Sequence, residues 1–201
     1  MTSSELERTL KSLPLCPATF KEPMECLAVS TLPDGPEWLY QVKLDGYRAM
    51  AVKSSGKLNL FSRRRNSFNS QHSLVFDALA DLPDNIVIDG EVVALNDSGR
   101  PDFNLLQHHR AQASRIHYFV FDLLTYDNHD LTRLPLIERH EIMESVLKLK
   151  SPRVRIVDHF EGLPPICSVQ FAPKGWKVSL LREGTVGTRL GKGAGRGPST
   201  G

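Results

Sequence analysis

A lysine, an aspartate and an arginine lie within six residues of one another, in the segment Lys43-Leu-Asp45-Gly46-Tyr-Arg48. In an extended strand, residues two apart share a face, so we expect Lys43 and Asp45 to point the same way. Asp-Gly favours a tight turn between antiparallel strands, which predicts that Arg48 returns beside them on a paired strand. This arrangement suits an amine that attacks phosphorus while the charge of the leaving group is neutralised.

The same segment also fits an ordinary hairpin between strands at 37–43 and 47–53, with solvated charges on one face. Four fixed letters arise by accident in a chain of this length about once in a thousand, on equal residue usage. Further site residues elsewhere in the sequence are therefore needed to distinguish a catalytic lysine from an ordinary hairpin.

Composition and length favour one domain, or one domain with a tail, because 201 residues can bury a core. The net charge of +2 is too small to indicate a polyanionic partner, although Arg63-Arg64-Arg65 and the segment 163–201 are locally basic. Three cysteines without metal-ligand spacing predict a reducing compartment. With no signal pattern and no long apolar run, we expect a cytoplasmic protein that is associated with the nucleoid when it is on DNA.

Hydrophobic periodicity predicts an α+β fold with mostly antiparallel sheets and packed helices. Helices are expected at 4–12, with Ser4 as cap, near 72–81, after Asp102 as cap, and at 135–147. An extended lead-in is expected at 14–36. Strands are expected at 37–43, 47–53, 58–62, 86–95, 116–124 and 154–160.

Three further segments follow the lysine in order. Phe61-Ser-Arg63 lies a short strand beyond it, Asp89-Gly-Glu91 places carboxylates inside an apolar strand, and Phe121-Asp-Leu-Leu places a ring on another strand. Buried carboxylates are costly unless they bind a cation or a polar ligand, and a ring can form the wall of a pocket for a flat base. Each segment alone fits a structural role, but their order and spacing after the lysine favour a single site.

In these motifs the chain resembles the adenylation domain of ATP-dependent DNA ligases, in particular the bacterial ligase D type, from about Pro17 to Gly162. The resemblance implies the covalent nucleotidyltransferase (ATP-grasp-like) fold, with ATP and Mg²⁺ as cofactors. It implies that Lys43 attacks the α-phosphate of ATP and holds AMP. The AMP would then pass to the 5′-phosphate of nicked double-stranded DNA, in DNA repair or recombination. We expect the protein to be monomeric.

The resemblance also assigns roles to single residues. Arg48 and Arg63 match positions that contact the nucleotide or the nick phosphate, Glu91 matches the carboxylate near the ribose and the metal, and Phe121 matches the ring that stacks on adenine. Gln41 stands where relatives often carry glutamate, and its carbonyl can accept from the adenine amino group. Asp45 is a supporting residue of the lysine motif.

The pattern of the family breaks after Gly162. The Glu-Gly-aliphatic-Val-x-Lys strand, the Trp-x-Lys segment and the following oligonucleotide-binding domain of the family do not occur. We therefore expect a helix and lead-in at 1–35, an incomplete adenylation domain at 36–162 and a Gly-rich, disordered basic tail at 163–201, with impaired activity. Two alternatives stay open: a non-catalytic remnant that binds nucleotide or DNA weakly, and an RNA ligase or capping-type nucleotidyltransferase.

A one-base shift near Gly162, in the gene or in its reported sequence, is our hypothesis for this tail. The codon of Trp176 ends in G and the codon of Lys177 begins with AA. In a reading frame shifted by one base these three bases form GAA, which encodes glutamate. The codons that follow permit Gly-Ile-Val-Ala-Lys-Arg, and those near Arg196 permit Trp-x-Lys, in the order of the family. Resequencing the locus tests the hypothesis, since an in-frame tail in both DNA and transcript removes it.

Overall fold

The computed structural model describes residues 1–24, 38–108, 113–161 and 177–182. Its strands are β1 (Trp38–Lys43), β2 (Tyr47–Ser54), β3 (Lys57–Ser62), β4 (Ile86–Ala94), β5 (Ile116–Tyr126), β6 (His129–Asp130), β7 (Val154–Ile156), β8 (His159–Glu161) and β9 (Lys177–Arg182). Its α-helices are α1 (Ser3–Lys11), α2 (Ser73–Ala78), α3 (Phe103–Gln107) and α4 (Leu136–Val146), and short 3₁₀ helices span Ala113–Arg115 and Leu131–Arg133.

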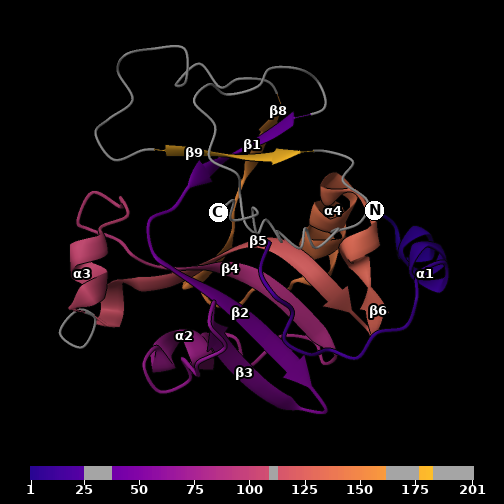
Figure 1. The fold of residues 1–201 in the computed structure, drawn as a ribbon, viewed down its shortest axis with the longest axis horizontal. Coiled ribbons are helices and arrows are strands. Elements are labelled where there is room, and N and C mark those ends of the chain that lie inside the picture. The colour runs from indigo at the N-terminus through magenta and orange to yellow at the C-terminus, as the bar shows by residue number, and fades with distance from the viewer. Residues whose placement is uncertain (25–37, 109–112, 162–176, 183–201) are drawn as a thin grey trace, which may run out of the picture.

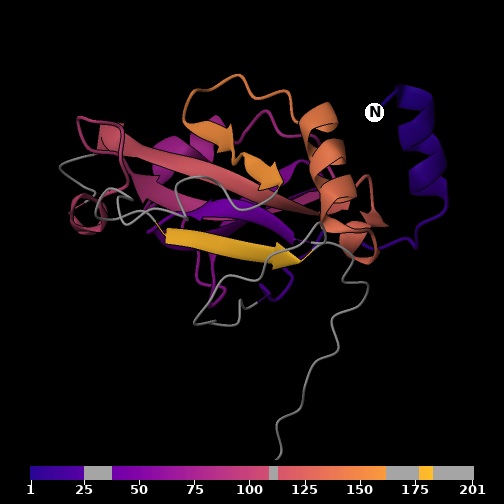
Figure 2. The same ribbon diagram turned by 90° about the horizontal axis from the view of Figure 1, so that it is seen from above.

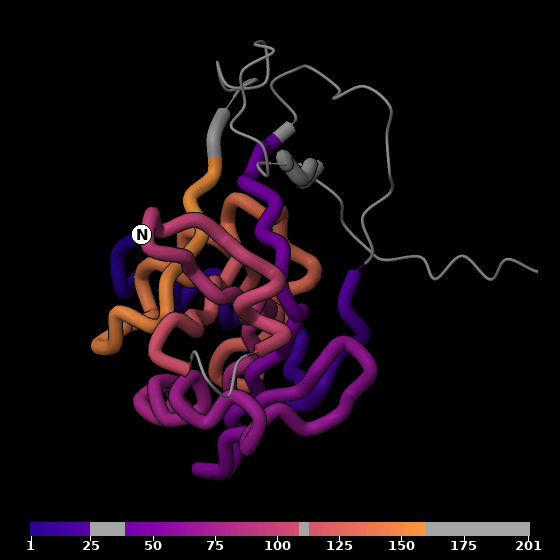
Figure 3. The backbone as a smooth tube through the Cα atoms, turned by 90° about the vertical axis from the view of Figure 1, so that its left-hand side faces the viewer, coloured from indigo at the N-terminus to yellow at the C-terminus, as the bar shows by residue number. Residues whose placement is uncertain are grey.

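Two sheets organise these elements. The larger has six strands in the order β3-β2-β4-β5-β6, with β7 paired to β5, and the smaller has three in the order β8-β1-β9. Only the β5–β7 pair is parallel among the strands that the structure describes. Figure 1 shows β1 and β9 above the larger sheet, and Figure 3 traces the backbone in a view turned by 90° about the vertical axis. The predicted α+β class with mostly antiparallel sheets is confirmed.

Most predicted elements form close to their expected bounds, and the differences have local causes. Helix α1 is capped by Thr2 rather than Ser4, because the Thr2 hydroxyl accepts from the Glu5 amide while the Glu5 carboxylate accepts from the Thr2 amide at 2.7 Å. Asp102 caps α3 as predicted, accepting from two amides of its first turn. The run expected as one strand at 154–160 forms β7 and β8, in different sheets.

The two faces of the larger sheet bury different clusters. One face packs against α2, α3 and α4 and carries the main core, which includes Ala49, Ala51, Ile88, Val120 and Leu123. The other face carries a smaller cluster in which Met50, Val52, Val87 and Leu124 pack against Ala18 and Phe20 of the lead-in. Figure 2 shows α4 and α1 side by side at one end of the sheet. No helix in the described ranges is long and apolar enough to cross a bilayer.

The predicted hairpin around Asp45-Gly46 is wrong. Strand β1 pairs with β8 and β9, whereas β2 pairs with β3 and β4, so residues 44–46 connect the two sheets. A two-residue Asp-Gly hairpin turn needs positive φ at both positions. Neither Asp45 nor Gly46 is among the residues with positive φ. The nucleophile candidate and the arginine therefore belong to different sheets.

The expected disordered tail needs a correction at six residues. Lys177–Arg182 forms β9, which pairs antiparallel along the whole of β1, from Trp38 opposite Arg182 to Lys43 opposite Lys177. The sequence of β9 has a short apolar run that suits a strand. The composition of the tail as a whole is rich in glycine, and for that reason it did not predict this strand. The rest of 163–201 lies outside the described residues.

Helix α4 is tied to β5 by a buried ion pair. Nε and Nη2 of Arg139 lie 2.7 and 2.8 Å from the two carboxylate oxygens of Asp122, and Nη1 donates to the carbonyl of Leu134 at 2.7 Å. Both side chains of the pair are about nine-tenths buried. The pair stabilises the fold only while both partners are present, because each alone is an uncompensated buried charge.

We predict that Arg139→Leu lowers the free energy of unfolding by about 3–5 kcal/mol, since it leaves the Asp122 carboxylate unpaired. Urea denaturation measures the change. Adding Asp122→Asn should recover a large part of the loss. Lys11→Ala, which removes a partner of an exposed pair with Glu7, should change stability by less than about 0.5 kcal/mol. A loss with Arg139→Leu no larger than that of Lys11→Ala contradicts the prediction.

Candidate active site

Lys43 is the last residue of β1, and its side chain is exposed. Gln41, two residues earlier in the same strand, is 4% exposed, so the strand passes from buried to solvent-facing at its end. Asp45 is also exposed, on the connection between the two sheets. The lysine is thus held by the smaller sheet at the border with the larger one.

Gly46 brings this connection against β4. A Cβ atom at Gly46 would overlap the carbonyl oxygen of Val92 and lie 2.9 Å from Cγ of Glu91. Only glycine therefore permits the approach, and the requirement is for space rather than for a turn conformation. The result places Glu91 directly beside the lysine segment, on the strand that pairs with β2.

Arg48 lies on the face of the larger sheet that carries the smaller cluster, and its described contacts include Asp89, Met24 and Phe121. Its Nε and Nη2 donate to the two carboxylate oxygens of Asp89 at 3.2 and 2.7 Å. Its Nη1 donates to the carbonyl of Met24 at 2.6 Å. Its guanidinium lies over the ring of Phe121, 5.3 Å from the centroid. The ring that was predicted to stack on a base is therefore in contact with the predicted arginine.

A β-bulge in β5 contributes to this contact. Gly90 pairs with Val120 and Asp89 pairs with Asp122, so Phe121 is an extra residue between two register positions. Bulges re-aim side chains next to functional sites. Here the bulge leaves Phe121 facing Arg48 and brings Asp122 opposite Asp89.

The two carboxylates on β4 differ in their partners. Asp89 is 2% exposed, and burial raises its pKa although its bonds to Arg48 act in the opposite direction. Burial also raises the pKa of Glu91, to about 7, against the opposing effects of Arg48 and Lys43. Asp89 and Asp45 add to the rise in the pKa of Glu91. Lys43, Arg48, Asp45 and Glu91 therefore share one electrostatic environment.

Asp89 is the residue that reasoning from sequence left out of the site. A buried carboxylate was expected to bind a cation or a polar ligand, and the structure gives the guanidinium of Arg48 as that cation. The signal was its position: Asp89 stands two residues before Glu91, in register opposite Met50, which is itself two residues after Arg48. Diagonal neighbours on paired strands are within reach of long side chains.

Arg63 lies in a different place, on the loop after β3. It lines a cleft of about 520 Å³ together with Phe20, Glu22, Pro23, Arg64 and Arg65. Gln41 has His159 and Ser179 as its register partners in the smaller sheet. The roles predicted for Arg63 and Gln41 toward a nucleotide stay predictions.

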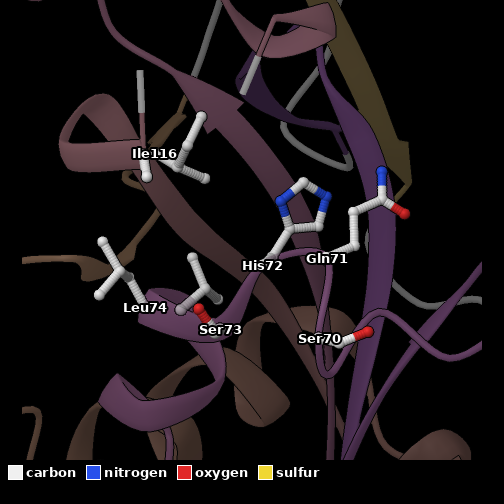
Figure 4. A pocket seen from close by; sticks show the side chains of 8 residues that line it. Ser70, Gln71, His72, Ser73, Leu74 and Ile116 are labelled. Carbon is white, nitrogen blue, oxygen red and sulfur yellow. The ribbon is translucent and has the colours of Figure 1, made fainter. Parts of the chain in front are cut away.

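A second cavity, of about 230 Å³, is lined by none of the predicted residues. Figure 4 shows its lining at the start of α2 and at Ile116. His72 in this lining is 4% exposed and packs edge-on against Phe68, with ring centroids 5.1 Å apart. The described lining carries no carboxylate, lysine or arginine side chain.

The carboxylates near Lys43 suit a Mg²⁺ ion that is also bound by the phosphates of a nucleotide. No group of three or more His, Cys, Asp or Glu side chains gathers anywhere in the described ranges. Mg²⁺ is usually bound by one or two carboxylates together with substrate phosphates and water. Glu91, with Asp45 beside it, supplies that number.

Comparison with known proteins identifies a family. The model of the ATP dependent DNA ligase domain matches residues 20–163. The multifunctional non-homologous end joining protein LigD of Pseudomonas aeruginosa is 35% identical over 79% of this chain and 19% of its own length. The SPbeta prophage-derived DNA ligase-like protein LigB of Bacillus subtilis is 29% identical over 71% of this chain and 53% of its own length. The chain thus spans less than two thirds of either relative.

Solved structures agree with the sequence comparison. The ligase domain of LigD from M. tuberculosis has a TM-score of 0.63 and 25% identity, covering 76% of this chain and 50% of that one. A mycobacterial DNA ligase D complexed with ATP and MES has the same TM-score and identity, and covers 86% of this chain and 55% of that one. The two-sheet fold described above is therefore the fold of a ligase nucleotidyltransferase domain.

The raised pKa of Glu91 predicts a pH dependence of stability. Its folded-state pKa of about 7 lies above the ordinary 4.5, so the folded protein holds this proton more tightly than the unfolded chain. The stability gained in this way is complete below pH 4.5 and is lost as the pH rises through 7. Glu91→Gln cannot lose a proton, so its free energy of unfolding relative to wild type should rise between about pH 5 and about pH 8.

Urea denaturation in buffer without magnesium or nucleotide measures this difference. Glu138→Gln, at an exposed position on α4, is the matched control and should show no comparable rise. Parallel pH profiles for Glu91→Gln and wild type would contradict the burial of an ionisable Glu91.

Proposed function

Because the chain belongs to the ATP-dependent DNA ligase domain family, we propose that residues 36–162 form an adenylation domain that charges Lys43 with AMP from ATP. The AMP is passed to the 5′-phosphate at a nick in double-stranded DNA, and the 3′-hydroxyl displaces it to seal the strand. The names of the relatives, a DNA ligase-like protein and an end-joining protein, support DNA as the substrate. The expectation of impaired activity remains part of the proposal.

In the first step, Nζ of Lys43 bonds to the α-phosphorus of ATP, and the bond from that phosphorus to pyrophosphate breaks. The ammonium first loses a proton to solvent, to which the Lys43 side chain is exposed, since only the neutral amine has a lone pair. Bound Mg²⁺ would neutralise charge on the phosphates and on the departing pyrophosphate.

The larger sheet binds the nucleoside in this proposal. Phe121 provides an aromatic face for adenine, with the Arg48 guanidinium on the same ring. Glu91 lies between the lysine segment and Arg48 and can accept a hydrogen bond from a ribose hydroxyl once it is ionised. Gln41 is proposed to accept from the adenine amino group, and Arg63 to contact the nick phosphate.

One observation carries the proposal: Gly46 brings the exposed Lys43 segment against Glu91, which is paired in register with the Arg48 that lies over Phe121. An amine, a carboxylate, a guanidinium and an aromatic ring, contributed by both sheets, thus meet at one border. A nucleotide has matching parts in its phosphates, ribose and base.

We predict that wild-type protein incubated with α-labelled ATP and Mg²⁺ acquires label as a covalent AMP adduct, and that Lys43→Ala abolishes it. Mass spectrometry of the intact chain and of its peptides locates the adduct. Lys57→Ala, at an exposed lysine on β3, is the control and should be labelled like wild type.

Folded wild-type protein that never acquires AMP would overturn the proposal and favour a non-catalytic remnant. Adding nicked DNA or nicked RNA to the charged protein then separates a DNA ligase from an RNA ligase, because only the preferred substrate discharges the AMP. Label that persists in Lys43→Ala would place the nucleophile elsewhere.

Asp89 is proposed to position Arg48, and its substitution tests that role. Asp89→Asn keeps the shape of the side chain and loses the paired charge, so kcat/KM for adenylation should fall about ten- to a hundredfold, or about 1.4–2.7 kcal/mol. Most of the loss should appear in KM for ATP if Arg48 acts on bound nucleotide. Asp97→Asn, at an exposed aspartate paired with Arg115, should leave both constants unchanged.

A further inference from the structure

A row of four side chains crosses the larger sheet at the level of Glu91. Arg48 on β2 is opposite Glu91 on β4 in register. Glu91 is in turn opposite Phe119 on β5, and Phe119 is opposite Arg155 on β7. Side chains directly opposite one another on paired strands lie on the same face of a sheet. The row therefore belongs to the face of the candidate active site, and its second half, Phe119 and Arg155, has no role in the function proposed above.

The smaller sheet is connected to the larger one at both ends of this row. Residues 44–46 lead from β1 to β2 and end two positions before Arg48. Residues 157–158 lead from β7 to β8 and begin two positions after Arg155. Arg155 thus stands at the same kind of border between the sheets as Lys43, on the opposite side of the row.

The guanidinium of Arg155 is held over the sheet and keeps donors to spare. The side chain is exposed, and the guanidinium lies 5.9 Å from the ring centroid of Phe119. Its Nε donates to the carbonyl of Pro152 at 3.1 Å. None of the ion pairs between described residues involves this arginine. The described contacts therefore leave Nη1 and Nη2, a pair of donors whose fork matches phosphate oxygens.

The nucleoside part of ATP is assigned to the first half of the row. Phe121, beneath the Arg48 guanidinium, is the proposed surface for adenine, and Glu91 is proposed to face the ribose. The α-phosphate has to meet Lys43, whose segment contacts Glu91 through Gly46. From there the second half of the row is the part of this face that the nucleoside leaves open to the outer phosphates.

This second half has a length that suits two phosphates. Neighbouring strands are about 4.8 Å apart, so the backbones of Glu91 and Arg155, two strands from each other, are roughly 10 Å apart. A diphosphate and an arginine side chain together span such a distance. The residue between them is Phe119, whose ring has no hydrogen-bonding group, so Arg155 is the donor at that end of the row.

We propose that Arg155 is a catalytic residue that binds the β- and γ-phosphates of ATP and the pyrophosphate that they become. This inference rests on the proposed function, which assigns no side chain to the leaving group. Nζ of Lys43 bonds to the α-phosphorus as the bond from that phosphorus to the bridging oxygen breaks. The oxygen keeps the electron pair and leaves with pyrophosphate, and the attacking nitrogen releases a proton to solvent. Arg155 keeps its protons and donates hydrogen bonds to the oxygens on which charge develops.

The test uses the reverse step, in which AMP-charged protein and pyrophosphate re-form ATP. Arg155→Gln should raise the pyrophosphate concentration for half-maximal rate about ten- to a hundredfold, because hydrogen bonds between charged groups are lost. Transfer of AMP from the charged protein to nicked DNA involves no pyrophosphate and should keep its wild-type rate. Arg155→Lys keeps the charge without the fork and should give an intermediate value. Arg8→Gln, at an exposed position on α1, should match wild type in both assays.

Equal half-maximal pyrophosphate concentrations for Arg155→Gln and wild type would overturn the inference. An equal slowing of both assays would also overturn it, since that result would place the effect of Arg155 on the fold or on the adenylate rather than on the leaving group.

Failure of wild-type protein to form the AMP adduct would sink the proposed function instead. Titration calorimetry of the uncharged protein with magnesium pyrophosphate then decides the inference. Binding by wild type that weakens at least about tenfold in Arg155→Gln supports the assigned contact. Equal affinities, or no binding by wild type, would remove it.

Discussion

The ion pair between Arg48 and Asp89 joins the parts of the molecule that the candidate site needs. Asp89 is buried on β4, and its only charged partner among the described contacts is the guanidinium of Arg48 on β2. With two of its nitrogens bound there, the guanidinium has a fixed plane. That plane allows one further donor to reach Met24 of the lead-in and one face to cover Phe121. Without this arginine, the buried Asp89 carboxylate would be an isolated charge. The same ion pair therefore positions Arg48 for the site and offsets the cost of burying Asp89.

The face of the larger sheet that carries Arg48 and Asp89 is apolar at one end of its strands and charged at the other. Met50, Val52 and Val87 are covered by Ala18 and Phe20 of the lead-in and form an apolar cluster. Two residues toward the smaller sheet, the positions on that face are charged: Arg48 on β2, and Asp89 followed by Glu91 on β4. Ala18 and Phe20 of the lead-in cover the apolar part, and the carbonyl of Met24 accepts from Arg48 in the charged part. The lead-in thus contacts both parts of this face.

The sequence predicted the strands and the order of the site residues because both depend on local pattern and spacing. It did not predict the pairing of strands, which depends on contacts between distant residues. Asp45-Gly46 suggested a hairpin, yet Gly46 is required by the closeness of Val92 and Glu91 on a strand more than 40 positions away. The partner of Asp89 was missed for the same reason. In the tail, strand Lys177–Arg182 was missed because a glycine-rich composition was averaged over a segment that contains a short apolar run.

The bulge at Phe121 also decides the phase of β5. Val120 and Leu123 both lie in the main core, although residues three apart point to opposite sides of a regular strand. Leu124, the next residue, belongs to the cluster on the other face. The extra residue thus lets Val120 and Leu123 share one layer, and a second shift of the β4–β5 register lies between Val87 and Ile88. Deleting Phe121 would leave Val120 and Leu123 two positions apart in a regular strand, so both would still face the main core. The hydrophobic layers therefore do not need this extra residue, and what its insertion adds is an aromatic ring in contact with Arg48.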